Sequence, residues 1–381
     1  MATIQNTSKI LLSILQTALF GTQFNRNLKL SHTEQEWKDL YKMAQQHGVV
    51  SIIYDAIADF SKEQQPPRHI KLQWALSADI IKKRYHKQSA LASALASLYA
   101  SNNINTIVLK GLAISKYYPI PEDRECGDLD CFLVNVDNSK PRCIAIHNNN
   151  LPKCRYADGN VIAKEAGAKV NVGFYKHSHI NYKGLIVENH AFCTAIRGSR
   201  QRKDLERHLQ MLLATQSCTS IGDTGLLCPS ADFNALFLTA HSFQHFLTEG
   251  IKLRHVLDWG LLLKHEQHNI DWKSFYEWCD KMHYTKFADA LTAIAIEDLG
   301  IEITNSNIHT KSKYKDKVLE DILFSNNTIH NTNASTLKKR LMIIRNKLFG
   351  GWKYRELYER SALVDTIQMI IAFFIERKPQ I

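Results

Sequence analysis

Two aspartates at the start of an apolar segment constrain the fold of this chain more than any other feature. Residues 128–134 have the sequence Asp-Leu-Asp-Cys-Phe-Leu-Val, which predicts a short buried strand. On a strand, Asp128 and Asp130 project from the same face, separated by a rise of roughly 6.6 to 6.8 Å. Charges on an apolar strand need a compensating cation, unless they lie at its solvated end. We therefore expect an α/β core with a cation site on one face of its sheet.

A second short strand is predicted upstream, at residues 104–109, and it ends at Lys110 and Gly111 before a short helical segment. The free N–H groups and the dipole at a helix N-terminus favour a phosphate. Gly111 permits close approach of the backbone to an anion, and Lys110 adds a positive charge. The sequence thus predicts a phosphate-binding turn beside the aspartates.

The wider pattern divides the chain into three regions. Residues 1–102 are expected to be helical, residues 103–199 to form the core, and residues 200–381 to be helical again. The first region contains an amphipathic core helix around residues 10–20 and a capping box at Thr33 and Glu36.

Within the core, Lys183-Gly184 predicts a hairpin turn between strands at 179–182 and 185–188. The C-terminal helices are predicted at 231–248, 253–264, 275–299 and 337–374, with an exposed connection at 304–333.

The order of these elements resembles the uncharacterised nucleotidyltransferases of the DNA polymerase β-like superfamily. The shared features are the strand with its Lys-Gly turn, the Arg-x-x-x-Asp-x-Asp segment with its apolar strand, and a later strand with Glu-x-His. The likeness covers residues 108–134 and 176–192 and, more loosely, 240–263. It implies an α+β fold in which a small mixed-sheet core is flanked by N-terminal and C-terminal helical regions. One difference is that Lys-Gly stands where many members have Gly-Ser.

The resemblance also implies a site. The implied catalytic metal ligands are Asp128, Asp130 and Glu188. The implied nucleotide-binding residues are Lys110, Gly111 and Arg124. Mg²⁺ is the expected metal, in a two-metal arrangement, with Mn²⁺ as the alternative. An NTP is the expected substrate, with ATP favoured.

Histidines near these residues form a second group of candidates. Alternation places His177 and His179 on one strand face, and antiparallel pairing brings them near His190. They are expected to contact substrate or to hydrogen-bond the carboxylates, with zinc ligation as a further alternative.

Three residues of the C-terminal region are further substrate-binding candidates: His241, Arg254 and Asp258. A helix packed over the cleft would use them to bind nucleotide or acceptor. The alternative for Arg254 and Asp258, which lie four residues apart, is an intrahelical ion pair.

The net charge of +11 favours anionic partners without choosing among them. The basic residues of the C-terminal region, including Lys338-Lys339-Arg340, are expected on a solvated helix face, with contact to nucleic acid or a membrane surface as the alternative. No run approaches the roughly 20 apolar residues of a transmembrane helix. The eight cysteines include no C-x-x-C pair, so reduced thiols and a cytoplasmic location are expected.

The expected function is Mg²⁺-dependent transfer of an NMP from an NTP to an acceptor hydroxyl of a small molecule, sugar or peptide product. Two alternatives stay open. One is a toxin- or antitoxin-like enzyme that modifies protein or RNA, and the other is a catalytically degenerate scaffold that binds a nucleotide.

Overall fold

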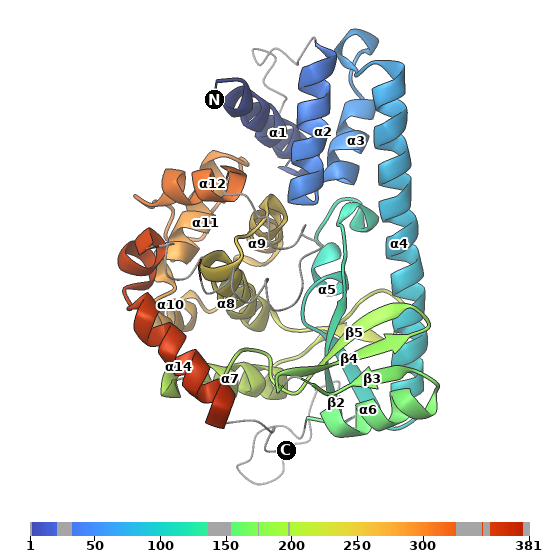
Figure 1. Cartoon of the computed structure of the whole chain (residues 1–381), viewed down its shortest axis with the longest axis vertical. Helices are drawn as coiled ribbons and strands as arrows, with labels where there is room; N and C mark the ends of the chain where they lie inside the picture. Colours follow the sequence, from blue (N-terminus) through green and yellow to red (C-terminus); the bar gives the residue numbers. More distant parts are fainter. Residues whose placement is uncertain are drawn as a thin grey trace.

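A seven-stranded mixed sheet supports one side of the molecule, and helices from both ends of the chain pack around it (Figure 1). The computed structural model describes residues 2–20, 33–135, 154–173, 175–196, 199–324, 345 and 351–375. The N-terminal helices are α1 (Ala2–Phe20), α2 (Glu34–His47), α3 (Val50–Ala58) and α4 (Arg68–Ala100). The long helix α4 runs from α3 to the sheet, so it joins the N-terminal helices to the core (Figure 1).

The sheet has the strand order β3-β4-β5-β2-β1-β7-β6. Its strands are β1 (Ile104–Val108), β2 (Leu129–Asn135), β3 (Lys169–Asn171), β4 (His177–Tyr182), β5 (Leu185–His190), β6 (Thr219–Ser220) and β7 (Leu226–Cys228). Strand β2 is antiparallel to β1 and parallel to β5. The short helix α5 (Leu112–Ser115) follows β1, and α6 (Tyr156–Glu165) precedes β3.

Strand β2 shows why the two faces of the sheet differ. Leu129, Cys131 and Leu133 pack in a cluster with residues of α4 and α6. Phe132 and Val134 point the other way, into the larger core that contains the C-terminal helices. Because side chains alternate along a strand, Asp130 shares the face of Phe132 and Val134 and lies on the side of the C-terminal helices.

The C-terminal region supplies the rest of the large core. Its elements are α7 (Arg200–Thr215), α8 (Ala231–Thr248), α9 (Leu253–Glu266), α10 (Trp272–Met282), α11 (Thr285–Glu297), α12 (Lys315–Phe324), the π-helical turn η3 (Lys353–Tyr358) and α14 (Ala362–Ile375). Helices α8 and α9 lie at the centre of the molecule, between the sheet and the remaining C-terminal helices (Figure 1).

Several predicted local features are confirmed. The side chain of Thr33 caps α2 in a capping box with Glu36. The hairpin turn joins β4 to β5 with positive φ at Lys183 (51°) and Gly184 (90°), as a two-residue primed turn requires. Helix α8 begins and ends at the predicted residues.

Other predictions are wrong. The segment expected as one helix at 275–299 is two helices, because His283 adopts a left-handed conformation with φ 60°. Strands β6 and β7 lie in the region expected to be helical. Helix α12 lies in the expected exposed connection, and its Val318 and Ile322 are buried.

Two predictions about the termini have different outcomes. Helix α1 buries Ile10, Leu11 and Ile14, which confirms an amphipathic core helix. In the basic C-terminal region, Lys353 is buried and pairs with Asp321 at 2.6 Å, so it is not on a solvated face. Residues 338–340 lie outside the described part of the chain.

The oxidation state of one cysteine differs from the expected reduced thiol. Cys218 is disulfide-bonded, so the prediction of reduced thiols is wrong there. Among the residues that the structure describes, the free thiols are Cys126, Cys131, Cys154, Cys193, Cys228 and Cys279.

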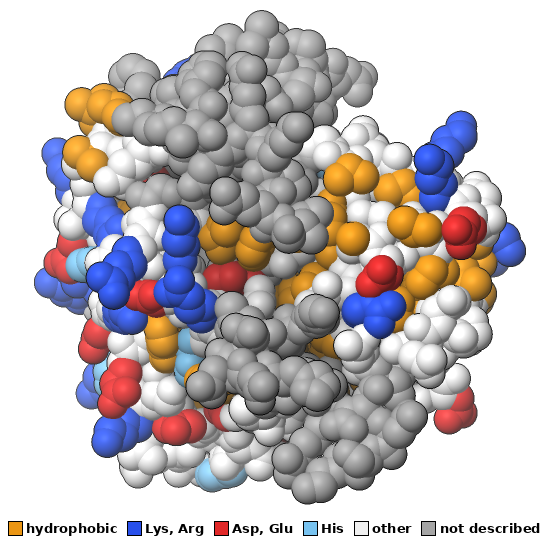
Figure 2. Space-filling model, turned by 90° about the horizontal axis from the view of Figure 1, so that it is seen from below, with side chains coloured by type: hydrophobic (Ala, Val, Ile, Leu, Met, Phe, Trp, Pro, Cys, Tyr) orange, Lys and Arg blue, Asp and Glu red, His pale blue; other side chains and the backbone are white. Residues whose placement is uncertain are grey.

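The hydrophobicity of the helices and the charge distribution on the surface relate to the expected membrane and anionic partners. Every helix in the described ranges is too short or too polar to cross a membrane. On the face in Figure 2, most Lys and Arg side chains gather on one side, interspersed with acidic ones, while apolar side chains are more frequent on the other side.

His47 joins the N-terminal helices to α9. Its ring is 2% exposed, and its Nδ1 accepts a hydrogen bond from the backbone N–H of Leu253 at 3.3 Å. Burial, with the nearby charge of Lys252, lowers the pKa of His47 from 6.5 to about 4. The ring is therefore neutral in the folded protein at pH 7.

We expect this contact to weaken in mild acid. Stabilisation by neutral His47 is complete above pH 6.5 and is lost as the pH falls toward 4, at about 1.4 kcal/mol per unit. Urea unfolding at pH 7 and pH 5 should therefore show the wild type losing about 2 kcal/mol relative to His47→Gln. The control, His268→Gln, removes an exposed imidazole and should change with pH as the wild type does. A pH-independent difference between wild type and His47→Gln would contradict the assignment.

Candidate active site

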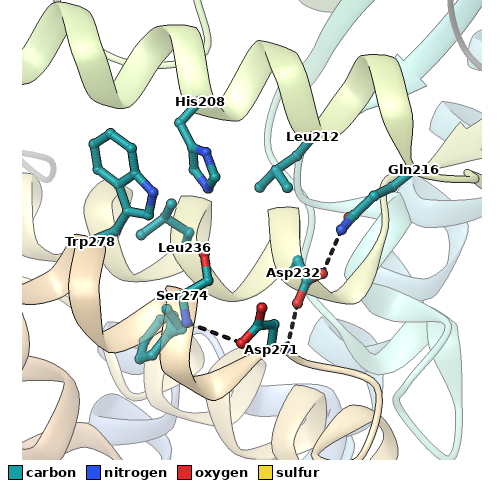
Figure 3. Close-up of a pocket in the computed structure, with 9 residues that line it drawn as sticks. His208, Leu212, Gln216, Asp232, Leu236, Asp271, Ser274 and Trp278 are labelled. Carbon is teal, nitrogen blue, oxygen red and sulfur yellow. Dashed lines mark hydrogen bonds between the residues drawn. The ribbon is translucent and has the colours of Figure 1, made fainter.

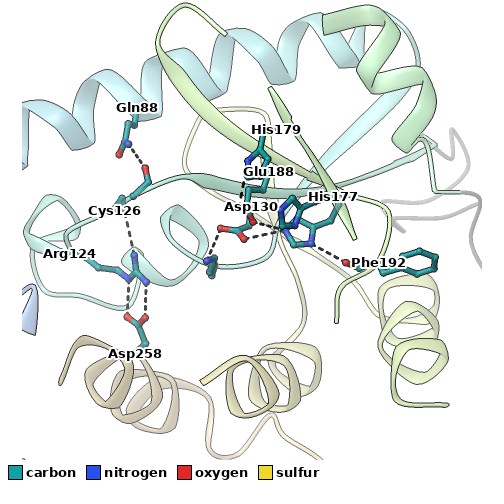
Figure 4. Close-up of polar contacts among 12 residues, drawn as sticks. Gln88, Arg124, Cys126, Asp130, His177, His179, Glu188, Phe192 and Asp258 are labelled. Atoms are coloured by element: carbon teal, nitrogen blue, oxygen red, sulfur yellow. Dashed lines mark hydrogen bonds and ion pairs between the residues drawn. The ribbon is translucent and has the colours of Figure 1, made fainter. Parts of the chain in front are cut away.

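Strand pairing gathers the predicted acidic and histidine residues on one face of the sheet. Parallel pairing of β2 with β5 places Asp130 opposite Glu188. Antiparallel pairing of β4 with β5 places His179 opposite Glu188 and His177 opposite His190. Figure 4 shows the side chains of Asp130, Glu188 and His177 converging at the same point. The register thus assembles the site from three adjacent strands.

Asp130 is the most buried carboxylate of the site, with 2% exposure. Lys110 Nζ lies 3.1 Å from its Oδ2, and His190 Nε2 lies 3.2 Å from its Oδ1. Burial by itself would raise the pKa of Asp130, but the charge of Lys110 and the hydrogen bond from His190 outweigh it and lower this pKa. Asp130 is therefore ionised at neutral pH.

The other two carboxylates lie in the same field. Asp128, one residue before β2, is half-buried, and burial together with the negative charge of Asp130 raises its pKa. Burial opposes ionisation of Glu188, but the hydrogen bond from His190 outweighs it and lowers the pKa of Glu188. At Asp128, the neighbouring side chains therefore do not fully neutralise the negative charge.

His190 links two of these carboxylates. Its Nε2 lies 3.2 Å from Asp130 Oδ1 and 3.5 Å from Glu188 Oε2, while its Nδ1 lies 3.0 Å from the carbonyl oxygen of Phe192. Although burial disfavours the charged ring, hydrogen bonds to Asp130 and Glu188 raise the pKa of His190. Both ring nitrogens face acceptors, which favours the imidazolium.

The donor set fits a hard divalent cation. Asp128, Asp130 and Glu188 offer carboxylate oxygens, the ligands that Mg²⁺ prefers. Ligand atoms of Asp130, Glu188 and His190 lie within 4.8 Å of one another. A cation at this point would relieve the repulsion that raises the pKa of Asp128.

The Lys-Gly turn lies beside the carboxylates, because its Lys110 forms an ion pair with Asp130. Gly111 has φ 64° and ψ −112°, a conformation that a residue with a Cβ rarely adopts. Helix α5 has only four residues, and its Ala113 and Ile114 N–H groups bond to the carbonyls of Lys110 and Gly111. The predicted helix-terminus effect on phosphate is therefore small, and Lys110 is the main positive group of the turn.

Lys176 is a charged residue of the site that the sequence did not single out. Its carbonyl accepts hydrogen bonds from the backbone of Ala191 and Phe192, which fixes the chain just before β4. Burial lowers the pKa of Lys176; Asp130 opposes this and the positive charge of Lys110 adds to it. In the described part of the chain, no carboxylate lies within 4.0 Å of Lys176 Nζ. In the sequence, Lys176 could have been recognised as a site candidate by its position directly before the histidine-containing strand.

Helix α8 faces the same cluster. Burial and then the positive charge of Lys110 lower the pKa of His241 well below its ordinary value, and Lys176 contributes. His241 is thus a neutral ring that lies within the electrostatic influence of Lys110 and Lys176.

The remaining predicted residues form a separate cluster, between the core and α9 (Figure 4). Arg124 is 5% exposed and makes two hydrogen bonds to Asp258, at 2.8 and 2.7 Å. Tyr118 also donates to Asp258, at 2.8 Å. Arg254 donates to the carbonyl of Glu125 at 2.6 Å. The alternative of an intrahelical Arg254–Asp258 pair is therefore wrong, because Asp258 pairs with Arg124.

The Arg124–Asp258 pair also supports the turn. A Cβ at Gly111 would lie 4.0 Å from Arg124 Nη1, so the guanidinium lies just beneath the Lys-Gly turn. Arg124 therefore joins α9 to the Lys-Gly turn.

A cavity of about 90 Å³ lies elsewhere, among α7, α8 and α10 (Figure 3). His208 stacks on Trp278 at 4.6 Å, and Asp232 accepts hydrogen bonds from Gln216 and from the backbone of Asp271. None of the predicted site residues lines this cavity.

The family model of an uncharacterised nucleotidyltransferase matches residues 33–300, which include all the carboxylates of the site. The chain belongs to this nucleotidyltransferase family, and the protein is an enzyme that transfers a phosphorus-containing group. No curated protein and no solved structure matches the chain.

The buried ion pair yields a stability prediction. Asp258→Ala leaves the guanidinium of Arg124 buried without its carboxylate, so we expect a loss of about 3–5 kcal/mol in the free energy of unfolding. Replacing both residues, Arg124→Met with Asp258→Leu, should recover part of the loss because no charge stays buried. Denaturant unfolding measures both variants.

The matched control is Asp158→Ala, which removes a half-exposed partner of Arg155 and should cost less than about 1 kcal/mol. If Asp258→Ala costs no more than this control, the pair does not hold α9 to the core.

Proposed function

We propose that the enzyme moves an NMP unit from an NTP to an acceptor hydroxyl on the β2–β5 face, in a Mg²⁺-dependent reaction. The observation that carries this proposal is the pairing of Asp130 with Glu188, with Asp128 two residues before Asp130. Two acidic residues at the start of β2, beside an acidic residue on β5, also support a polymerase β-like core flanked by helices.

Asp128, Asp130 and Glu188 would hold the metal ions. Bound there, Mg²⁺ supplies charge neutralisation for the triphosphate and lowers the pKa of a coordinated hydroxyl. Lys110 and Lys176 contribute positive charge on the same side and stabilise the leaving pyrophosphate. Glu188, whose pKa is lowered by His190, is anionic and can accept the proton of the attacking hydroxyl.

In the proposed step, the acceptor oxygen bonds to the α-phosphorus while the bond from that phosphorus to the β-phosphate oxygen breaks. Pyrophosphate leaves, and the acceptor proton passes to Glu188 or to solvent. Most of the catalysis comes from positioning and charge, which is typical of phosphoryl transfer.

The first prediction concerns the carboxylates. Asp128→Asn removes one negative charge at nearly constant volume, so we expect the rate of NMP transfer to fall by about 100-fold or more while the melting temperature stays close to that of wild type. Incubation with [α-³²P]ATP and Mg²⁺, followed by pyrophosphate and label measurements, tests this. Asp158→Asn, an exposed change on α6, is the control that should keep full activity. Transfer at the wild-type rate by Asp128→Asn would refute the assignment.

The same assay separates the acceptor classes. The probe is offered with a small-molecule extract, with purified RNA and with protein in separate reactions. Label in sugars, peptides or other small molecules supports the proposal. Label in RNA or protein would favour a macromolecule-modifying enzyme, and ATP binding without any transfer would favour a nucleotide-binding scaffold.

The second prediction concerns Lys176. Replacing it by Met removes a positive charge from the site, so the Kd for Mg²⁺–ATP should rise about tenfold. Lys169→Met, on the exposed strand β3 of the same sheet, is the matched control and should leave the Kd unchanged. Equal affinities in the two variants would show that Lys176 does not contact the triphosphate. Isothermal titration calorimetry at two salt concentrations provides the measurement.

A further inference from the structure

The two carboxylate oxygens of Glu188 face different groups. Oε1 lies 3.4 Å from His177 Nε2 and 3.9 Å from His179 Nδ1. Oε2 lies 3.5 Å from His190 Nε2, the ring that also contacts Asp130. Glu188 is therefore shared between the acidic cluster and a pair of histidines on β4, and the acidic cluster accounts for only one of its oxygens.

The separations on the β4 side match those of metal ligands. Two ligand atoms that lie 2.1 Å from one ion at a tetrahedral angle are about 3.4 Å apart. Ligand atoms of His177, His179 and Glu188 all lie within 4.8 Å of one another, so a small contraction completes a three-ligand site. The imidazole rings are nearly perpendicular, at 80°, with centroids 4.8 Å apart, so the two nitrogens approach Glu188 from different directions.

The surroundings hold Glu188 in this orientation. His190 Nε2 contacts Oε2, and its Nδ1 lies 3.0 Å from the carbonyl oxygen of Phe192, which fixes the ring. Ligand carboxylates in metal sites are oriented by hydrogen bonds of this kind. The side chain of His179 is 51% exposed, whereas that of His177 is 12% exposed, so an ion could enter from solvent past His179.

We propose that His177, His179 and Glu188 bind a divalent transition-metal ion of the Zn²⁺ class, at a position distinct from the all-oxygen one at Asp128 and Asp130. Imidazole nitrogens bind such ions in preference to Mg²⁺, which takes oxygen ligands. Two histidines and one glutamate also leave a coordination position open for water or a substrate oxygen. The proposal rests on the proposed function only because Glu188 is a proposed metal ligand at both the carboxylate position and the histidine position.

The test uses the full-length protein without nucleotide, so it does not depend on NMP transfer. Co²⁺, whose visible absorption reports its ligands, is titrated into the protein and then displaced. We expect one equivalent of Co²⁺ to bind with a visible band, to be displaced by Zn²⁺ at a comparable concentration, and to stay bound in a large excess of Mg²⁺. Absence of the band, or displacement by Mg²⁺ at an equal concentration, would overturn the proposal.

Variants locate the ion. His179→Asn changes an exposed side chain, so the fold should survive, and we expect the affinity for Co²⁺ to fall by at least about tenfold. His177→Asn should have a similar effect. His268→Asn, at an exposed histidine that hydrogen-bonds Thr304, is the control and should bind Co²⁺ as the wild type does. Unchanged Co²⁺ affinity in His179→Asn would refute the assignment.

Asp128→Asn separates this proposal from the proposed function. It should keep the Co²⁺ band, because Asp128 is not a ligand at the histidine position. A wild-type protein that binds Co²⁺ at His179 but transfers no NMP would support the metal site and refute the function, whereas the reverse result would refute only the metal site.

Discussion

The parallel pairing of β2 with β5 is the constraint on which the site depends. It sets Asp130 directly opposite Glu188 in a nearly water-free position, where two negative charges would otherwise destabilise the fold. Lys110 and His190 offset this cost, since each contacts Asp130 within about 3.2 Å. Asp128 is not neutralised in this way, because burial and the negative charge of Asp130 raise its pKa.

The alternation of β2 explains how a small sheet can carry such a charged face. On one side of the strand, Leu129, Cys131 and Leu133 pack against α4 and α6. On the reverse side of β4 and β5, Ser178, Asn189 and Asn160 of α6 form a buried hydrogen-bonded group. These contacts hold the sheet from the side opposite the acidic cluster.

The C-terminal helices complete the site from the front. The Arg124–Asp258 pair joins α9 to the Lys-Gly turn, and α8 brings His241 toward Lys110 and Lys176. Membership of the nucleotidyltransferase family over residues 33–300 fits this construction, because the match includes helices α2 to α4, the sheet and helices α7 to α11.

Local sequence determined much of this protein. The apolar segment with its aspartates, the Lys-Gly turn and the Lys183-Gly184 hairpin were predictable because each depends on residues a few positions apart. The break between α10 and α11 was not, because a non-glycine residue, His283, adopts the left-handed conformation there. Strands β6 and β7 were also missed, since two or three residues form a strand only where a sheet edge is offered.

Only the tertiary structure decided which charges meet. The family resemblance implied a nucleotide-binding role for Arg124, and an Arg254–Asp258 ion pair was one alternative for those two residues. In the folded chain, Arg124 is buried against Asp258, 134 residues away. Lys176 and the two histidines of β4 became site residues through the register of three strands. Residue types and spacing therefore determined which chemical groups this enzyme has available. Long-range pairing decided which charged side chains contact one another, because the energy of a buried charge depends on the groups that surround it in space.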